Sequence, residues 1–138
     1  INVRRGDYLT QSDRHPVITK EYIFEGLKNI PKCDNYLILS DDLDWWKENI
    51  KIANSHFVSN YWDNKGIWLM SLCHHFIISN SSFSWWSAYL SKYENKKIVT
   101  PSIWVGPGII ENMNDVWCED WIKIDCKYNK GKIELNYV

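Results

Sequence analysis

Residues 76–90 read Phe-Ile-Ile-Ser-Asn-Ser-Ser-Phe-Ser-Trp-Trp-Ser-Ala-Tyr-Leu, and this stretch decides the fold of the chain. Its three apolar residues, its small polar residues and its helically spaced aromatic residues predict a buried strand, a turn and a helix, in that order. A helix N-terminus has unpaired N–H groups and a partial positive charge, so the turn suits a phosphate group. The same residues also fit an ordinary capped helix. We expect Trp85 and Trp86 to pack behind the turn and hold it in place.

Short apolar strands alternate with helical segments along the rest of the chain. We expect Thr19 to cap the helix that follows it, Pro31 to end that helix, and residues 8–16 to form a loop. This alternation predicts βαβ units, and thus an α/β fold with a mostly parallel sheet and flanking helices. Further strands are predicted at residues 1–3, 36–39, 56–58 (ending at Ser59-Asn60), 97–100 and 132–135, further helices at 19–30, 43–50 and 66–75, and an aromatic anchor at 117–124.

Polar side chains follow the predicted strands at their carboxyl ends. Arg4-Arg5-Gly6-Asp7 follows the first strand, Ser40-Asp41-Asp42 the second and Asn80-Ser81-Ser82 a later one, and Pro101 follows the strand after that. The carboxyl ends of parallel strands lie along one edge of a sheet, where ligands bind. We therefore expect two arginines, several acids and a serine-rich helix N-terminus to meet in one crevice. That combination suits a phosphorylated ligand with a polyol or a base attached.

The composition argues against several classes of protein. The chain has 138 residues, enough for one domain, and its net charge of −1 gives no reason to expect binding to nucleic acid or to an anionic membrane. Walker A, GxGxxG, GxSxG and HExxH motifs are absent. No apolar run approaches the roughly 20 residues of a membrane span. The four cysteines form no CxxC pair, so we expect buried free thiols and no metal site.

Each polar group at the predicted edge has more than one explanation. Arg4 and Arg5 could clamp a pyrophosphate with their guanidinium forks, or could form ion pairs with acids such as Asp7. Because neighbouring residues at a strand end point to opposite faces, we expect one arginine to reach a ligand and the other to brace the loop. Asp41 and Asp42 could bind Mg²⁺, ribose hydroxyls or a base, act in acid–base catalysis, or cap the next helix.

Four segments resemble a known family. They are Val3 to Leu9, Ser40-Asp41-Asp42, Leu69 to Cys73 and Ile78 to Leu90, in that order. Over about residues 1 to 125 they resemble the bacterial-type α-1,2-fucosyltransferases of glycosyltransferase family 11. The serine–tryptophan segment is long and specific, whereas related fucosyltransferases share the arginine segment. The resemblance implies that residues 1–138 are one Rossmann-like, GDP-fucose-binding domain: the C-terminal half of a longer, GT-B-like protein.

The resemblance also implies a reaction and a site. The reaction is an inverting, metal-independent transfer of L-fucose from GDP-β-L-fucose to a galactose-type hydroxyl in α-1,2 linkage, with no cofactor. By position, Arg4 or Arg5 would hold the diphosphate and stabilise the leaving GDP, and the Ser81-Ser82-Phe83 turn would meet the phosphates. The remaining implied residues are Asp7, which is grouped with the arginines at the catalytic centre and would orient their loop, and Asn2, Asp41, Asp42 and Asn80, which are candidates for donor contacts.

Two positions depart from the family pattern. The family commonly has His where this chain has Asn2, and often an acidic residue where it has Gly66. Both departures affect residues expected to contact the donor, so two other interpretations stay open: a non-catalytic nucleotide- or glycan-binding module, and a transferase for another sugar nucleotide.

The expected partners are GDP-fucose, a glycan acceptor and a missing N-terminal half, without nucleic acid. The expected location is the cytoplasm, with peripheral attachment to the inner membrane as the alternative.

Overall fold

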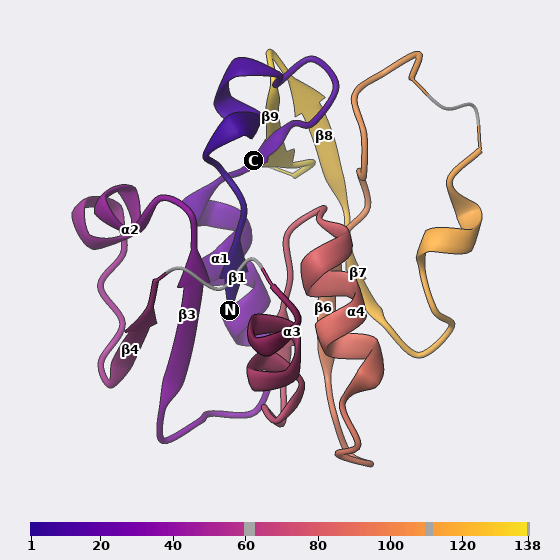
Figure 1. Cartoon of the computed structure of the whole chain (residues 1–138). Coiled ribbons are helices and arrows are strands. Elements are labelled where there is room, and N and C mark those ends of the chain that lie inside the picture. Colours follow the sequence, from indigo (N-terminus) through magenta and orange to yellow (C-terminus); the bar gives the residue numbers. More distant parts are fainter. Residues whose placement is uncertain (60–62, 110–111, 138) are drawn as a thin grey trace.

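The computed structural model describes residues 1–59, 63–109 and 112–137 (Figure 1). Strands alternate with helices along most of these ranges, and the two strands nearest the C-terminus, drawn in yellow, lie at one end of the molecule. None of the helices in the described ranges combines the length and the apolar character that a bilayer-crossing helix needs.

The strands of the described residues form three small sheets, and two of these sheets are entirely parallel. In the first sheet β3 lies between β1 and β4, and in the second β6 lies between β5 and β7. In the third sheet β9 pairs in parallel with β2 and antiparallel with β8. The strands are β1 (Asn2–Val3), β2 (Val17–Ile18), β3 (Tyr36–Ser40), β4 (Ser55–Val58), β5 (Phe76–Ile77), β6 (Ile98–Pro101), β7 (Ile122–Ile124), β8 (Cys126–Asn129) and β9 (Lys132–Leu135).

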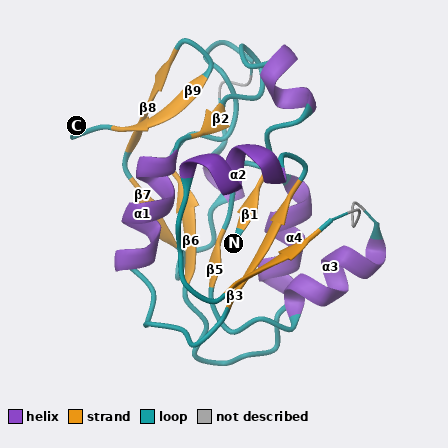
Figure 2. Cartoon of the chain, turned by 90° about the vertical axis from the view of Figure 1, so that its left-hand side faces the viewer, coloured by secondary structure: helices purple, strands orange, loops and turns teal. Residues whose placement is uncertain are grey.

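Helices cover both faces of the two parallel sheets (Figure 2). One core lies under α1 and α2, and a second core lies under α3 and α4. This is a doubly covered, Rossmann-like arrangement, as the alternation of strands and helices predicts. The helices are α1 (Lys20–Lys28), α2 (Leu43–Asn49), α3 (Asn64–Ser71) and α4 (Ser82–Leu90), with 3₁₀ helices η1 (Asp7–Thr10) and η2 (Asn114–Val116).

The two cores result from the alternation of side chains along buried strands. Ile38 packs in the α1–α2 core and its neighbour Leu39 in the α3–α4 core, and Ile77 and Ile78 divide in the same way. Strands that are buried on both faces appear in sequence as continuous apolar runs. The buried hydroxyl of Tyr22, from α1, donates a 2.7 Å hydrogen bond to the Ile78 carbonyl and so ties α1 to the end of β5.

Several local predictions need correction. The predicted loop at 8–16 overlaps η1, and Thr19 makes no capping hydrogen bond although it occupies the N-cap position of α1. The helix predicted at 66–75 runs instead from Asn64 to Ser71, because the Asp63 carboxylate accepts hydrogen bonds from the first turn and fixes the start. The predicted strand end at Asn60 lies outside the described residues. The predictions lacked β2 near the N-terminus and, in the C-terminal region, β7 and β8.

Candidate functional site

Arg4 lies at the carboxyl end of β1, on the side of the sheet that carries α3 and α4. Val3 packs in the α1–α2 core, so the alternation of side chains sends Arg4 to the other face. Its guanidinium group lies 2.8 Å from Asp7 Oδ1 and 2.9 Å from Asp41 Oδ2. Its central carbon lies 5.4 Å from the ring centre of Tyr8. Two carboxylates and an aromatic ring therefore fix the orientation of this cation.

Arg5 points to the opposite face, toward α2. Its Nε atom donates a 3.2 Å hydrogen bond to Asp42 Oδ2, and its guanidinium carbon lies 4.0 Å from the ring centre of Trp45. This is a cation–π contact at the start of α2. The two adjacent arginines thus have separate surroundings, as predicted, and Arg5 is the one that braces a neighbouring helix.

Asp41 and Asp42 hold these arginines in different ways. Asp41 accepts a 2.7 Å hydrogen bond from the backbone N–H of Arg5 through one oxygen and pairs with Arg4 through the other. Asp42 is the N-cap of α2, where it accepts a 3.1 Å hydrogen bond from the Trp45 N–H. The prediction that one of the two acids caps the next helix is therefore confirmed for Asp42.

Gly6 explains why the arginine loop can approach Asp41 so closely. A Cβ atom at Gly6 would lie 2.4 Å from Asp41 Oδ2, well inside the contact distance of two heavy atoms. Around the two arginines, the three carboxylates of Asp7, Asp41 and Asp42 outnumber the two guanidinium groups. Asp7 is the accessible member of this set, because its side chain is 55% exposed, whereas that of Asp41 is 11% exposed.

Asn80 joins three loops at the same edge of the sheet. Its side-chain amide donates hydrogen bonds of 3.0 Å to the Pro16 carbonyl and 2.9 Å to the Trp104 carbonyl. Its own carbonyl accepts a 3.1 Å hydrogen bond from the Tyr8 hydroxyl. Asn80 is 2% exposed, so the structure gives it a role in holding the loops after β1 and β6 around the turn.

The turn after Asn80 leads directly into α4. Ser81 occupies the N-cap position but makes no capping hydrogen bond, and it is buried. Ser84 instead donates 3.0 Å hydrogen bonds to the carbonyls of Ser79 and Ser81. Ser82 is exposed, and Phe83 is half-buried against the α3–α4 core. The first turn of a helix presents backbone N–H groups that can bind anions.

Asn2 lies deeper than the other predicted site residues. It is completely buried, and both ends of its amide bond to groups inside the protein, the carbonyl of Leu39 and the hydroxyl of Ser79. The structure therefore uses Asn2 to connect β1 with its neighbours and does not bring it to the surface beside the arginines.

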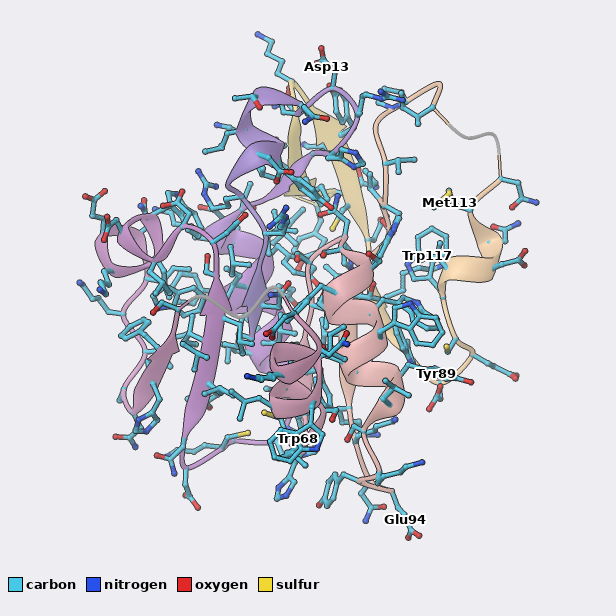
Figure 3. All side chains as sticks on the ribbon, in the orientation of Figure 1. Asp13, Trp68, Tyr89, Glu94, Met113 and Trp117 are labelled. Atoms are coloured by element: carbon cyan, nitrogen blue, oxygen red, sulfur yellow. The ribbon has the colours of Figure 1, made fainter. Side chains whose placement is uncertain are left out.

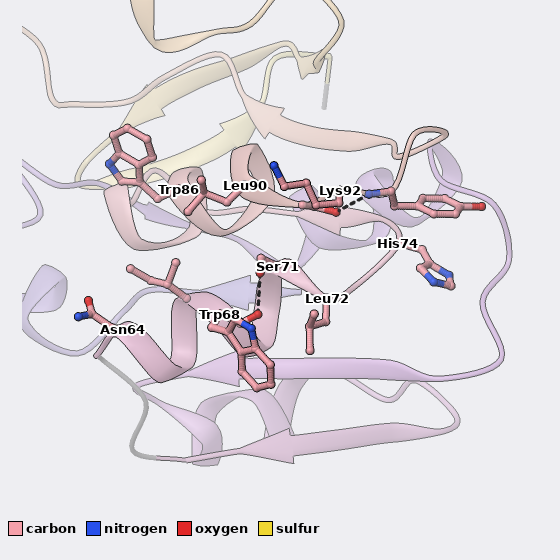
Figure 4. Close-up of a pocket in the computed structure, with 11 residues that line it drawn as sticks. Asn64, Trp68, Ser71, Leu72, His74, Trp86, Leu90 and Lys92 are labelled. Atoms are coloured by element: carbon pink, nitrogen blue, oxygen red, sulfur yellow. Dashed lines mark hydrogen bonds between the residues drawn. The ribbon is translucent and has the colours of Figure 1, made fainter.

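A separate groove of about 840 Å³ lies between α3 and α4 (Figure 4). Trp68 and Leu72 line one wall and Trp86 and Leu90 the other, and each is about half exposed or more. Figure 3 shows Trp68 projecting from this face of the molecule. No predicted donor-binding residue lines the groove. The prediction that both tryptophans pack behind the turn holds for Trp85, which packs in the α3–α4 core, whereas Trp86 lies edge to face against Trp85 and is half exposed.

Thiols and metal ligands are dispersed in the described residues. In the described ranges, no group of three or more His, Cys, Asp or Glu side chains could hold a metal ion. The four cysteines are free, but only Cys126 is buried, whereas Cys33, Cys73 and Cys118 are half-buried. The expectation of buried thiols thus holds for one of the four.

Sequence reasoning missed two residues of the arginine site, Tyr8 and Trp45. Tyr8 stands within the arginine segment, two residues after Gly6, and its position in that segment was the available signal. Trp45 could be identified only from the position of α2. Asp42 caps this helix and so places Trp45 in its first turn, where the Trp45 ring contacts Arg5.

Known proteins resemble this chain over most of its length. An α-1,2-colitosyltransferase of Escherichia coli is 29% identical over 136 residues, which cover 91% of this chain and 47% of that protein. The O-antigen biosynthesis glycosyltransferase WbnK of Escherichia coli is 28% identical over 134 residues, which cover 90% of this chain and 43% of that protein. A galactoside α-(1,2)-fucosyltransferase 1 of Bos taurus is 26% identical over 102 residues, which cover 66% of this chain and 28% of that protein.

The chain thus spans about half the length, or less, of the curated relatives that it matches. No solved structure matches it significantly. The family model for glycosyl transferase family 11 matches residues 1–125, which include the arginine loop, both acids and the whole of α4. The chain therefore belongs to glycosyltransferase family 11.

Proposed function

We propose that the chain forms the donor-binding half of an α-1,2-fucosyltransferase. The whole protein then transfers L-fucose from GDP-β-L-fucose to a galactose-type hydroxyl, with inversion and without a metal ion. An N-terminal half outside residues 1–138 supplies the acceptor site. Family membership supports the class of reaction, and the names of the colitosyl- and fucosyltransferase relatives support the α-1,2 linkage.

One observation carries this proposal: Arg4 and the start of α4 are linked through a single residue, Tyr8. The Tyr8 ring contacts the Arg4 guanidinium, and its hydroxyl bonds to the turn before α4. Guanidinium forks and helix N-termini are both phosphate-binding groups. A diphosphate has two phosphoryl groups, so it can engage both at once.

The reaction assigns different tasks to the two arginines. As the acceptor oxygen attacks C1 of fucose, the bond from C1 to the β-phosphate oxygen breaks and its electron pair stays on GDP. Arg4 stabilises that developing charge, while Arg5, held by Asp42 and Trp45, keeps the loop in place. The proton of the acceptor hydroxyl passes to a general base, which we place in the acceptor-binding half.

Calorimetry on the 138-residue chain tests the proposal. GDP should bind with the same affinity in the presence and absence of EDTA, and UDP should bind more weakly. Arg4→Ala should weaken GDP binding at least about tenfold, because a charged hydrogen-bond donor to phosphate contributes roughly 1.5–3 kcal/mol. The matched variant Arg14→Ala removes an exposed arginine from the following loop and should bind GDP normally.

Preference for UDP, absence of nucleotide binding, or loss of GDP affinity on addition of EDTA would each overturn the proposal.

A second candidate function is a non-catalytic glycan-binding module. It follows from the carboxylates around Arg4, which could bond to sugar hydroxyls. That candidate predicts binding on a glycan array without nucleotide. The name of the colitosyltransferase relative also supports another donor sugar, and comparison of GDP-fucose with GDP-colitose distinguishes the two donors.

A further inference from the structure

The ring of Tyr8 contacts two neighbouring side chains, Arg4 and His15. The guanidinium carbon of Arg4 lies 5.4 Å from the ring centre. The imidazole of His15 stacks on the ring with a centroid separation of 4.8 Å and an angle of 20° between the planes. A tyrosine side chain has only two rotatable bonds, so these contacts define its position at little entropic cost.

The hydroxyl end of Tyr8 is held as firmly as the ring. It donates a 3.1 Å hydrogen bond to the Asn80 carbonyl. Burial raises the pKa of Tyr8 above its ordinary value, with the charges of Asp7 and Asp41 acting in the same direction and that of Arg4 against it. The hydroxyl therefore stays protonated and remains a donor at neutral pH.

The partner of that hydroxyl is itself immobilised. The side-chain amide of Asn80 bonds to the carbonyls of Pro16 and Trp104, which anchors the turn to two other loops. Tyr8 therefore connects the Arg4 guanidinium to a fixed point one residue before the N-cap of α4.

We infer that Tyr8 is a positioning residue that sets the spacing between Arg4 and the N-terminus of α4, so that both meet one diphosphate. This inference rests on the proposed function, because it takes the diphosphate as the ligand. Tyr8 acts through the other two groups and need not touch the ligand. Preorganised spacing of this kind favours binding because no ordering remains to be done when the ligand arrives.

The inference predicts a selective loss of affinity for diphosphates. Tyr8→Phe keeps the ring contacts with Arg4 and His15 but removes the hydrogen bond to Asn80. We expect its affinity for GDP to fall about 3- to 10-fold, the range of one neutral hydrogen bond. The affinity for GMP should change less than twofold, because one phosphate does not have to span both groups. Tyr8→Leu, which also removes the ring, should lower the GDP-to-GMP affinity ratio further.

Tyr128→Phe is the matched control. The Tyr128 hydroxyl bonds to Asp13 at 3.4 Å, in the loop that follows η1. It should leave the GDP-to-GMP ratio unchanged. Thermal melts of each variant show that the measurements are made on folded protein.

The outcomes separate the two claims. If the unmodified chain binds GDP and Tyr8→Phe keeps its GDP-to-GMP ratio, or loses both affinities equally, Tyr8 has at most a structural role and this inference fails alone. If the unmodified chain binds neither nucleotide, the proposed function fails and the inference fails with it.

Discussion

The hydroxyl of Ser79 donates a 2.8 Å hydrogen bond to the amide oxygen of Asn2, and both side chains are completely buried. In the described part of the chain, β1 and β5 belong to different sheets and share no ladder. The amide nitrogen of Asn2 donates to the Leu39 carbonyl at 3.2 Å. One side chain therefore connects β1 with β3 on one side and with the end of β5 on the other.

Asn2→Ala should lower the free energy of unfolding by roughly 2–3 kcal/mol, because it leaves the buried Ser79 hydroxyl without its acceptor and removes a second buried hydrogen bond. Urea denaturation measures the change. Asn136→Ala is the control, since its amide bonds to Asp125 on the surface, and it should change stability by less than about 0.5 kcal/mol. Equal effects of the two variants would contradict the role given to Asn2.

Arg5→Lys should separate stability from ligand binding. Lysine keeps the charge but loses the planar group over Trp45 and the Nε donor to Asp42, so we expect a loss of about 1 kcal/mol in unfolding free energy. GDP affinity should fall less than in Arg4→Lys, measured by calorimetry under the same conditions. A larger loss of GDP affinity in Arg5→Lys would exchange the tasks assigned to the two arginines.

Much of the fold could be predicted because its buried strands are apolar runs with polar ends. Residues 36–39 and 97–100 illustrate this, and both overlap observed strands, β3 and β6. β2 has only two residues and β8 reads Cys-Lys-Tyr-Asn, so neither shows a spacing of apolar residues that distinguishes it from a loop. These strands form because β9 provides a ladder for them, which is a non-local interaction.

The arginine site was predictable only in outline. Strand ends place Arg4, Asp41 and the turn before α4 at one edge of the sheet, and the structure brings them there. The burial of individual polar side chains could not be predicted from the sequence. Asn2 and Ser81 have side chains that suit a ligand site, yet both are buried. The hydroxyls and amides that sequence reasoning assigned to a ligand are used in part to join loops.

His75 should make stability depend on pH. Its Nδ1 accepts a 3.1 Å hydrogen bond from the Lys97 N–H, and burial, followed by the charges of His74 and Lys97, lowers the pKa of His75. As pH falls through about 6.5, the ordinary pKa of histidine, the unfolded state therefore binds this proton first, and the native state loses stability.

Urea midpoints at about pH 7.5 and about pH 5.5 measure this dependence. The drop toward low pH should be smaller in His75→Asn than in the unmodified chain. His56→Asn is the control, because the His56 ring is exposed and pairs with the Asn35 side chain, and it should keep the full drop. An unchanged drop in His75→Asn would show that other groups account for it.

Cys126 should react far more slowly with iodoacetamide than the half-buried thiols. Burial raises the pKa of Cys126 to about 11, so at about pH 8 roughly one thiol in a thousand is the reactive thiolate, and the surrounding core blocks access to it. Peptide mass spectrometry of the native chain should find Cys33 and Cys118 alkylated first, and Cys126→Ser should leave their rates unchanged. In concentrated urea all four cysteines should react at similar rates. If Cys126 kept pace with Cys33 in the native chain, the region where β8 pairs with β9 would have to open readily, which its place in the α1–α2 core argues against.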